Sequence, residues 1–121
     1  MKMRIDLLEG KFIPTKAAAD IAAGQLVEVV GDGEVQPTAG ASSKVLGVAL
    51  MNAKAGEKVT VVRKSVIIVT ASEAITAGDL VKSAADGKVA KFAAGTDDPS
   101  LLLGFALTGG AADEEITIVL R

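Results

Sequence analysis

The stretch Ile75-Thr76-Ala77-Gly78-Asp79-Leu80-Val81 has a counterpart 54 positions earlier, Ile21-Ala22-Ala23-Gly24-Gln25-Leu26-Val27. Each copy contains an apolar residue, a short turn with a glycine, and the start of an apolar strand. The match continues at the same spacing, where Asp32-Gly33 corresponds to Asp86-Gly87. Self-similarity at a fixed period is the sequence signature of a repeated structural unit. The chain is therefore predicted to contain two copies of one small unit.

The C-terminal part of each copy matches at a slightly larger spacing. Leu46-Gly47 corresponds to Leu103-Gly104, and Val59-Thr60-Val61 corresponds to Ile116-Thr117-Ile118, in both cases 57 positions later. The three additional residues belong to the predicted loop between residues 91 and 101. Two collinear blocks that differ by one small insertion indicate an internal duplication.

The duplication leaves the N-terminal residues outside the repeated body. We predict a single β domain over residues 1–121, with an extended N-terminal arm (1–15), a first repeat (16–63) and a second repeat (64–121). From Met3 to Leu7 apolar and charged residues alternate, a period that is typical of an extended segment with one apolar side. The first strand of the domain's own sheet would show the same pattern, so both interpretations of the arm stay open.

Branched aliphatic residues and glycine dominate the composition. Half of the 121 residues are apolar, 13 are glycine, and only three are aromatic, all of them phenylalanine. This composition favours many short strands joined by tight turns. The sequence therefore predicts an all-β fold, a small compact β-barrel or β-tulip-like domain built from the two collinear repeats.

Each repeat is expected to contain a hairpin followed by two further strands. The hairpins are expected at residues 26–36 and 80–92, the next strands at 45–51 and 101–107, and the last strands at 58–70 and 115–120. A break at residues 63–65 marks either a bend or the junction between the repeats. The segments 59–62 and 116–119 are apolar on both faces, whereas a sheet with one face in water alternates apolar and polar residues. The second face is therefore expected to be covered, by the other repeat or by another subunit.

Six glycines are predicted to be structural turn positions: Gly24, Gly33, Gly47, Gly78, Gly87 and Gly104. Glycine adopts a positive φ without steric cost, which tight turns demand. Gly47 lies within an apolar stretch, where it would also suit a bulge or a close approach of two backbones. Gly24 and Gly78 are expected to occupy equivalent backbone positions.

The sequence contains no recognisable catalytic or cofactor site. It has no cysteine and no histidine, which removes disulfides, thiolate ligands and the commonest general base. The acidic clusters at residues 97–98 and 113–115 lack the spacing of a calcium-binding loop. We therefore predict no enzyme activity, no cofactor and no metal, and we interpret the clusters as solvated turn residues.

The charge balance indicates a protein partner rather than nucleic acid or membrane. The formal net charge is −2, and the three isolated phenylalanines form no platform for stacking bases. No segment approaches the roughly 20 apolar residues of a membrane helix. The mean hydropathy of +0.43 is high for a domain of this size, which indicates surface reserved for a partner or for self-association.

Five segments resemble a known family. In the first repeat they are Gly31-Asp32-Gly33-Glu34-Val35-Gln36-Pro37, Val45-Leu46-Gly47-Val48-Ala49-Leu50 and Glu57-Lys58-Val59-Thr60-Val61-Val62-Arg63-Lys64-Ser65; in the second they are Ala74-Ile75-Thr76-Ala77-Gly78-Asp79-Leu80-Val81 and Leu103-Gly104-Phe105-Ala106-Leu107. Their order is similar to that in the small head decoration (capsid cement) proteins of tailed bacteriophages, including those of the lambda head decoration type.

The resemblance covers most of residues 16–121. It implies a compact β fold without catalytic residues, a homotrimer placed between capsomers, and the major capsid protein as partner. It also implies a location on the outer capsid surface of the virion, after synthesis in the host cytoplasm. Three alternatives stay open: the base of a head fibre, another accessory head protein, or a small β-clip or carrier-like binding module.

The N-terminal arm is the candidate for contact with the capsid or another partner. The candidate residues are Met1, Lys2, Met3, Arg4, Ile5, Asp6 and Leu7. They lie outside the duplicated body, and residues 1–16 carry four basic and two acidic side chains. An extended arm can add a strand to an exposed sheet edge of a neighbouring subunit, where backbone hydrogen bonds supply affinity.

Overall fold

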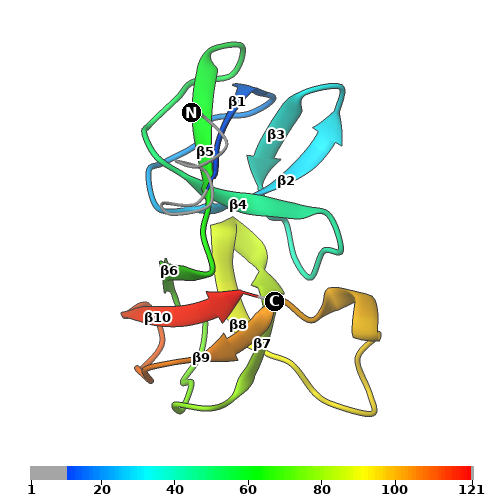
Figure 1. Cartoon of the computed structure of the whole chain (residues 1–121), viewed down its shortest axis with the longest axis vertical. Helices are drawn as coiled ribbons and strands as arrows, with labels where there is room; N and C mark the ends of the chain where they lie inside the picture. The colour runs from blue at the N-terminus through cyan, green and yellow to red at the C-terminus, as the bar shows by residue number, and fades with distance from the viewer. Residues whose placement is uncertain (1–10, 121) are drawn as a thin grey trace.

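A computed structural model describes residues 11–120, which form ten β-strands arranged in two units along the long axis of the molecule (Figure 1). The first unit contains β1 (Lys11–Ala17), β2 (Leu26–Gly31), β3 (Glu34–Pro37), β4 (Val45–Ala49) and β5 (Lys58–Arg63). The second contains β6 (Val66–Thr70), β7 (Leu80–Ala84), β8 (Lys88–Lys91), β9 (Gly104–Ala106) and β10 (Glu115–Leu120), with single 3₁₀ turns η1 (Ala85–Gly87) and η2 (Pro99–Leu101). The prediction of an all-β fold with a compact barrel is confirmed.

The first unit is a closed barrel with the strand order β1-β3-β2-β4-β5. β1 lies antiparallel to β5 from the pair Lys11–Arg63 to the pair Lys16–Lys58, and it closes the barrel by pairing in parallel with β3. Residues 11–15, predicted as part of the arm, therefore belong to the barrel, so any arm ends before Lys11. Pro14 fits this strand because β1 contacts β3 only at Lys16 and Ala17, which leaves an open edge at Pro14.

The second unit repeats the connectivity of the first. Its strand order is β6-β10-β9-β7-β8, and each strand occupies the place of the strand five earlier in the chain. The parallel contact that closes the first barrel is reduced here to a single bridge between Ala71 and Val89. The second unit is therefore an open five-stranded sheet with a narrow gap between β6 and β8.

Backbone hydrogen bonds recur at matching positions of the two units. The amide of Gly24 donates to the carbonyl of Ala49 at 2.9 Å, and the amide of Gly78 donates to the carbonyl of Ala106 at 2.7 Å. The φ angles of the two glycines are 91° and 92°. The internal duplication is thus present in three dimensions.

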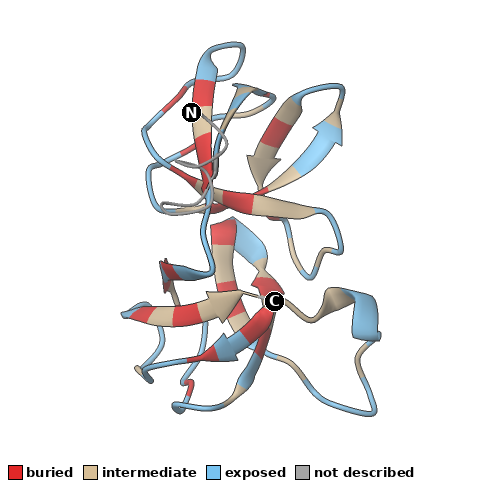
Figure 2. Ribbon diagram, viewed as in Figure 1, coloured by how far each residue is buried: buried red, intermediate tan, exposed pale blue. Residues whose placement is uncertain are grey.

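Two hydrophobic clusters form the core, one for each unit. Buried residues alternate with exposed or intermediate ones along strands such as β10, as expected for strands with one face inward (Figure 2). Val27 belongs to the cluster of the first unit. Leu26, the preceding residue, points to the opposite side and belongs to the cluster of the second unit. Leu26 therefore joins the two cores.

Polar contacts reinforce this junction between the units. The hydroxyl of Thr38 donates to the carbonyl of Ala84 at 2.7 Å, and the hydroxyl of Ser83 donates to the carbonyl of Gly40 at 2.8 Å. Both hydroxyl-bearing residues are buried, and a buried hydroxyl without a partner would cost free energy. The loop between β3 and β4 is thereby held against β7.

Candidate interaction surface

The acidic clusters have structural roles. Asp97 accepts hydrogen bonds from the amide of Ala93 and from Nζ of Lys82, both at 2.8 Å, and these two donors lower the pKa of Asp97. Asp98 accepts from the amide of Ser100 at 2.9 Å, which lowers the pKa of Asp98. Each carboxylate holds the loop before β9 in place.

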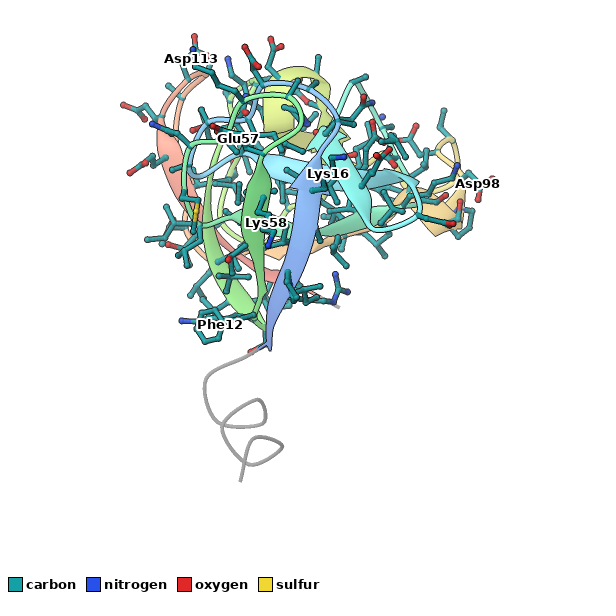
Figure 3. The ribbon with its side chains drawn as sticks, turned by 90° about the horizontal axis from the view of Figure 1, so that it is seen from above. Phe12, Lys16, Glu57, Lys58, Asp98 and Asp113 are labelled. Atoms are coloured by element: carbon teal, nitrogen blue, oxygen red, sulfur yellow. The ribbon has the colours of Figure 1, made fainter. Side chains whose placement is uncertain are left out.

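The second acidic cluster lies on a different side of the molecule, far from Asp98 (Figure 3). Asp113 forms an ion pair of 2.8 Å with Lys88, which raises the pKa of that lysine. Glu114 accepts from the amide of Ala111 at 2.7 Å. Across residues 11–120, no three acidic residues are grouped as a metal site would require. Within the same range no helix has the length and apolar character needed to cross a membrane.

The main exposed feature is the outer face of the second sheet. Direct cross-strand pairs link Val66 to Val119, Val119 to Phe105, and Phe105 to Leu80. Residues that are directly opposite share one face of a sheet, so these four side chains form a row across four strands. A second row on the same face joins Ile68 of β6 to Thr117 of β10, with Leu107 hydrogen-bonded beside Thr117.

The outer face is defined by its uncharged centre, which consists of Val66, Ile68, Leu80, Phe105, Leu107, Thr117 and Val119. Lys82 of β7 and Glu115 of β10 lie beside this centre on the same side of the sheet, each two residues from a member of the centre. Ile68 is 59% exposed, Leu107 53% and Phe105 40%. Isolated exposed apolar residues are common, but a contiguous group on one sheet face is typical of an interaction site. The prediction that both faces of these strands are apolar agrees with this arrangement.

An apolar groove of about 430 Å³ adjoins the outer face and spans both units. Its lining residues are Phe12, Val48, Ala49, Leu50, Val62, Lys64, Val66, Ile67, Ile68 and Thr117. Phe12 lies at the start of β1, so the N-terminal residues enter the described structure beside this groove. The groove and the outer face together form the candidate interaction surface.

The residues predicted to bind a partner, Met1 to Leu7, lie outside the described residues. The prediction for the arm therefore stays a prediction. The side chains that form the outer face were not identified individually from the sequence. Their signal was the apolar character of both faces of strand 116–119, but sequence could not show which face stays exposed, because that depends on how the two units pack.

The predicted turn glycines divide into two groups. Gly24, Gly33, Gly78 and Gly87 have positive φ angles of 91°, 66°, 92° and 69°. Gly47 and Gly104 do not lie in turns, which corrects that part of the prediction, because they lie in β4 and β9. A Cβ atom at Gly47 would collide with the carbonyl oxygen of Val62, and one at Gly104 with that of Val119. A shift of register in β4 next to Gly47 agrees with the expected bulge.

Comparison with known proteins adds two findings. The model of a family described as phage cement protein matches residues 7–121, which is nearly the whole chain. The fold is similar to a crystal structure of the head fiber gp8.5 N base in bacteriophage phi29, with a TM-score of 0.74 and 23% sequence identity. That similarity covers 92% of this chain and 93% of the other. No curated protein matches the sequence.

Proposed function

Because the chain belongs to the phage cement protein family, we propose that it is a capsid decoration subunit that binds the outer face of a phage head and bridges neighbouring capsomers. The family makes it a structural protein of the phage head and hence a component of the virion. The subunit adds buried area across several capsid contacts and stabilises the head by avidity. It is made in the host cytoplasm and requires no catalytic chemistry or cofactor.

The observation that carries this proposal is the candidate interaction surface. A sheet face with an uncharged centre and an apolar groove are suited to a protein partner and not to a small polar ligand. The partner in the proposal is the major capsid protein. Residues 1–7 add a strand to an edge of that protein, and the groove beside Phe12 receives apolar side chains next to the added strand.

Self-association is the second part of the proposal. The subunit acts as a homotrimer on the capsid, because a closed symmetric assembly covers apolar surface and supplies several capsid contacts at once. The uncharged centre of the outer face supports this part, since charged residues are depleted at the centres of subunit interfaces.

A head-fibre base is the second candidate function. It is favoured by the structural similarity to a protein described as a head fiber N base, which extends over almost the full length of both chains. Such a base would also sit on the capsid, but it would present a further fibre segment or a fibre partner. Images of decorated capsids separate the two functions, because a cement subunit adds a low layer without protruding fibres.

The direct test is to mix the purified protein with expanded, undecorated capsids and to image them. We expect ordered density at sites between capsomers and a higher temperature of capsid disruption. Ile68→Asp, in the groove, should weaken binding at least tenfold, because burial of a charge in an apolar contact is costly. Ala74→Asp serves as the matched control, because Ala74 is exposed outside the groove. Failure of the unmodified protein to bind would contradict the capsid role and favour a carrier-like module.

A further inference from the structure

Equivalent leucines of the two units have opposite environments. Leu26 begins β2 and Leu80, 54 positions later, begins β7. Leu26 is completely buried, at 0% exposure, because it packs into the core of the second unit. Leu80 is 36% exposed at the edge of the outer face. The first unit therefore buries a surface against the second, whereas no unit within residues 11–120 covers the corresponding surface of the second unit.

Neighbouring residues show the same asymmetry. Val48 of β4 is partly buried and packs against the core cluster of the second unit. Its equivalent in β9 is Phe105, which is 40% exposed. Leu80 and Phe105 thus form an exposed apolar surface on the second unit. The equivalent surface of the first unit, at Leu26 and Val48, forms the contact between the two units.

The turn before each leucine repeats the pattern. Gln25 packs against the β7–β8 hairpin so closely that a Cβ atom at Gly87 would lie 2.5 Å from Cβ of Gln25. Nε2 of Gln25 also donates to the carbonyl oxygen of Asp86 at 3.1 Å. The equivalent hairpin of the first unit has Gly33 in place of Gly87, and nothing lies within 4 Å of a Cβ atom built there. The hairpin at Gly33 in the first unit is therefore an open receptor for a turn of the same kind.

The pockets beside the two hairpins correspond as well. In the second unit a pocket of about 220 Å³ lies between β6 and β8, and the turn residues Ala23, Gly24 and Gln25 form one of its walls. In the first unit the corresponding pocket beside Gly33 measures about 540 Å³, and no such turn lines it. The larger volume is consistent with a receptor whose occupant belongs to another molecule.

Exposed valines in β2 extend this receptor. The loop between β3 and β4 covers β7 through the bond of Thr38 to Ala84 and through a 2.8 Å bond from the amide of Ser42 to the hydroxyl of Ser83. The residues of β2 equivalent to Ser83 and Ala84 are Val29 and Val30, which are 37% and 46% exposed. Residues 11–120 thus leave two large apolar side chains partly in water at this position.

Charge complementarity favours a second copy as the occupant. Lys16 and Lys58 lie directly opposite each other on β1 and β5, and both line the open pocket (Figure 3). Like charges in direct opposition are unfavourable, and within residues 11–120 neither lysine has an ion pair. The turn that would enter this pocket carries Asp79 where the first unit has Gln25. The occupant thus brings a carboxylate to a pair of lysines, although Asp32 and Glu34 flank Gly33 on the other side.

We propose that copies of this chain associate head to tail, with the turn at Gly78 and Leu80 of one copy docked against the hairpin at Gly33 and the Lys16–Lys58 pair of the next. This contact brings together, between molecules, the same elements that the two units bring together within one molecule. The hydrogen bond that Gln25 donates to Asp86 has no equivalent, because the carboxylate of Asp79 only accepts hydrogen bonds. The contact is heterologous, because different surfaces of the two copies meet. The inference rests on the self-association part of the proposed function and is independent of capsid binding.

A cysteine pair tests the contact directly, because the natural chain has no cysteine. Asp79→Cys and Asp32→Cys are prepared as separate proteins and mixed under mild oxidation. The equivalent pair within the chain, Gln25 and Asp86, is in hydrogen-bond contact, so we expect a disulfide-linked heterodimer in the mixture. Mixing Asp79→Cys with Ala74→Cys is the control, since Ala74 lies outside both surfaces, and it should give no specific product.

The outcomes separate the possible arrangements. Rapid linkage of Asp79→Cys to itself, without Asp32→Cys, would indicate a two-fold contact and overturn the head-to-tail arrangement. The unsubstituted protein, measured alone by light scattering, would also overturn the head-to-tail arrangement if it stayed monomeric at all accessible concentrations. If that monomer still binds undecorated capsids, the capsid role stands and only the self-association is wrong.

A second pair of variants tests the apolar part of the contact. Leu80→Asp should raise the concentration needed for assembly at least tenfold, because it places a charge where Leu26 is fully buried in the equivalent contact. Ala74→Asp is the control, because Ala74 is exposed and lies outside both surfaces. Circular dichroism verifies that both variants fold. An equal effect of both substitutions, or no effect of Leu80→Asp, would contradict the proposal.

Discussion

Backbone geometry, and not packing, requires glycine at two equivalent positions of this protein. Gly24 and Gly78 have φ angles of 91° and 92°, and nothing lies within 4 Å of a Cβ atom built on either. Space is therefore available for a side chain at both positions. The requirement for glycine comes from the positive φ, a region that residues with a Cβ atom rarely adopt.

Replacement of these glycines should expose that requirement. Gly24→Ala and Gly78→Ala should each lower the free energy of unfolding by about 1 to 3 kcal/mol, and by similar amounts, because the two positions share one conformation. Chemical denaturation measures the change. Gly40→Ala is the control: Gly40 also has free space for a Cβ atom, but its φ is not positive, so its substitution should have a much smaller effect.

The ionisation of Glu28 is coupled to the stability of the fold. Burial by itself would raise the pKa of Glu28, but hydrogen bonds from Gln36, Ser42 and the amide of Ala39, together with nearby Lys44, outweigh it and lower the pKa. The charged form of Glu28 therefore ties the loop after β3 to β2. Stability from this group is present above the pKa of the unfolded chain and is lost as the pH falls through the lower pKa of the folded protein.

The expected pH dependence follows from the lowered pKa of Glu28 in the folded protein. The melting temperature of the unmodified protein should exceed that of Glu28→Gln at neutral pH, and the difference should shrink as the pH falls below the ordinary range of a glutamate. Asp32→Asn is the control, because the Asp32 side chain accepts no hydrogen bond from residues 11–120. A difference that grows toward low pH would contradict the assignment.

At the scale of the elements, β1 determines where the domain begins. Its antiparallel ladder with β5 extends from Lys11 to Lys16, so the barrel is complete without the preceding residues. The first barrel closes through a parallel contact of only two residue pairs between β1 and β3. The loss of β1 would therefore open the barrel.

Deletion of Met1 to Glu9 separates a binding arm from a structural strand. We expect the shortened protein to melt within a few degrees of the full chain, because no described strand is removed. Its binding to undecorated capsids should fall strongly, because the residues proposed to add a strand to the capsid protein are gone. A large drop in melting temperature would instead show that these residues belong to the domain's own sheet.

At the scale of the whole molecule, the two units form one cooperative structure. Leu26 lies in the core of the second unit, and the hydroxyls of Thr38 and Ser83 each donate to a backbone carbonyl across the junction. The second unit has no closed barrel of its own, since β6 and β8 share a single bridge. The first unit therefore covers a gap that the second unit does not close by itself.

Equivalent leucines should consequently differ in their contribution to stability. Leu26→Ala should lower the free energy of unfolding by about 2 to 5 kcal/mol, the range for a large-to-small substitution in a core. Leu80→Ala should cost less than about 1 kcal/mol when measured on dilute, unassembled protein, because Leu80 is partly in water. Similar costs for both variants would contradict the assignment of Leu26 to the joint core.

The sequence was sufficient for those features that depend on local pattern. The duplication, the hairpins at Gly33 and Gly87, and the last strand from Glu115 to Leu120 follow from turn glycines and from apolar periodicity, which act over a few neighbouring residues. The strand boundaries were less accurate in β4 and β9, because the predicted strands 45–51 and 101–107 are longer than the observed Val45–Ala49 and Gly104–Ala106. The close approach of two backbones that was expected at Gly47 is present.

Only the tertiary structure decided which apolar surfaces stay in water. Leu26 and Leu80 occupy equivalent sites in similar sequences, and no local pattern distinguishes them. Their exposures of 0% and 36% differ because Leu26 packs against the second unit, whereas no unit within residues 11–120 covers Leu80 in the same way. Burial depends on contacts between residues that are distant in sequence, so the candidate interaction surface emerged only when both units were placed together.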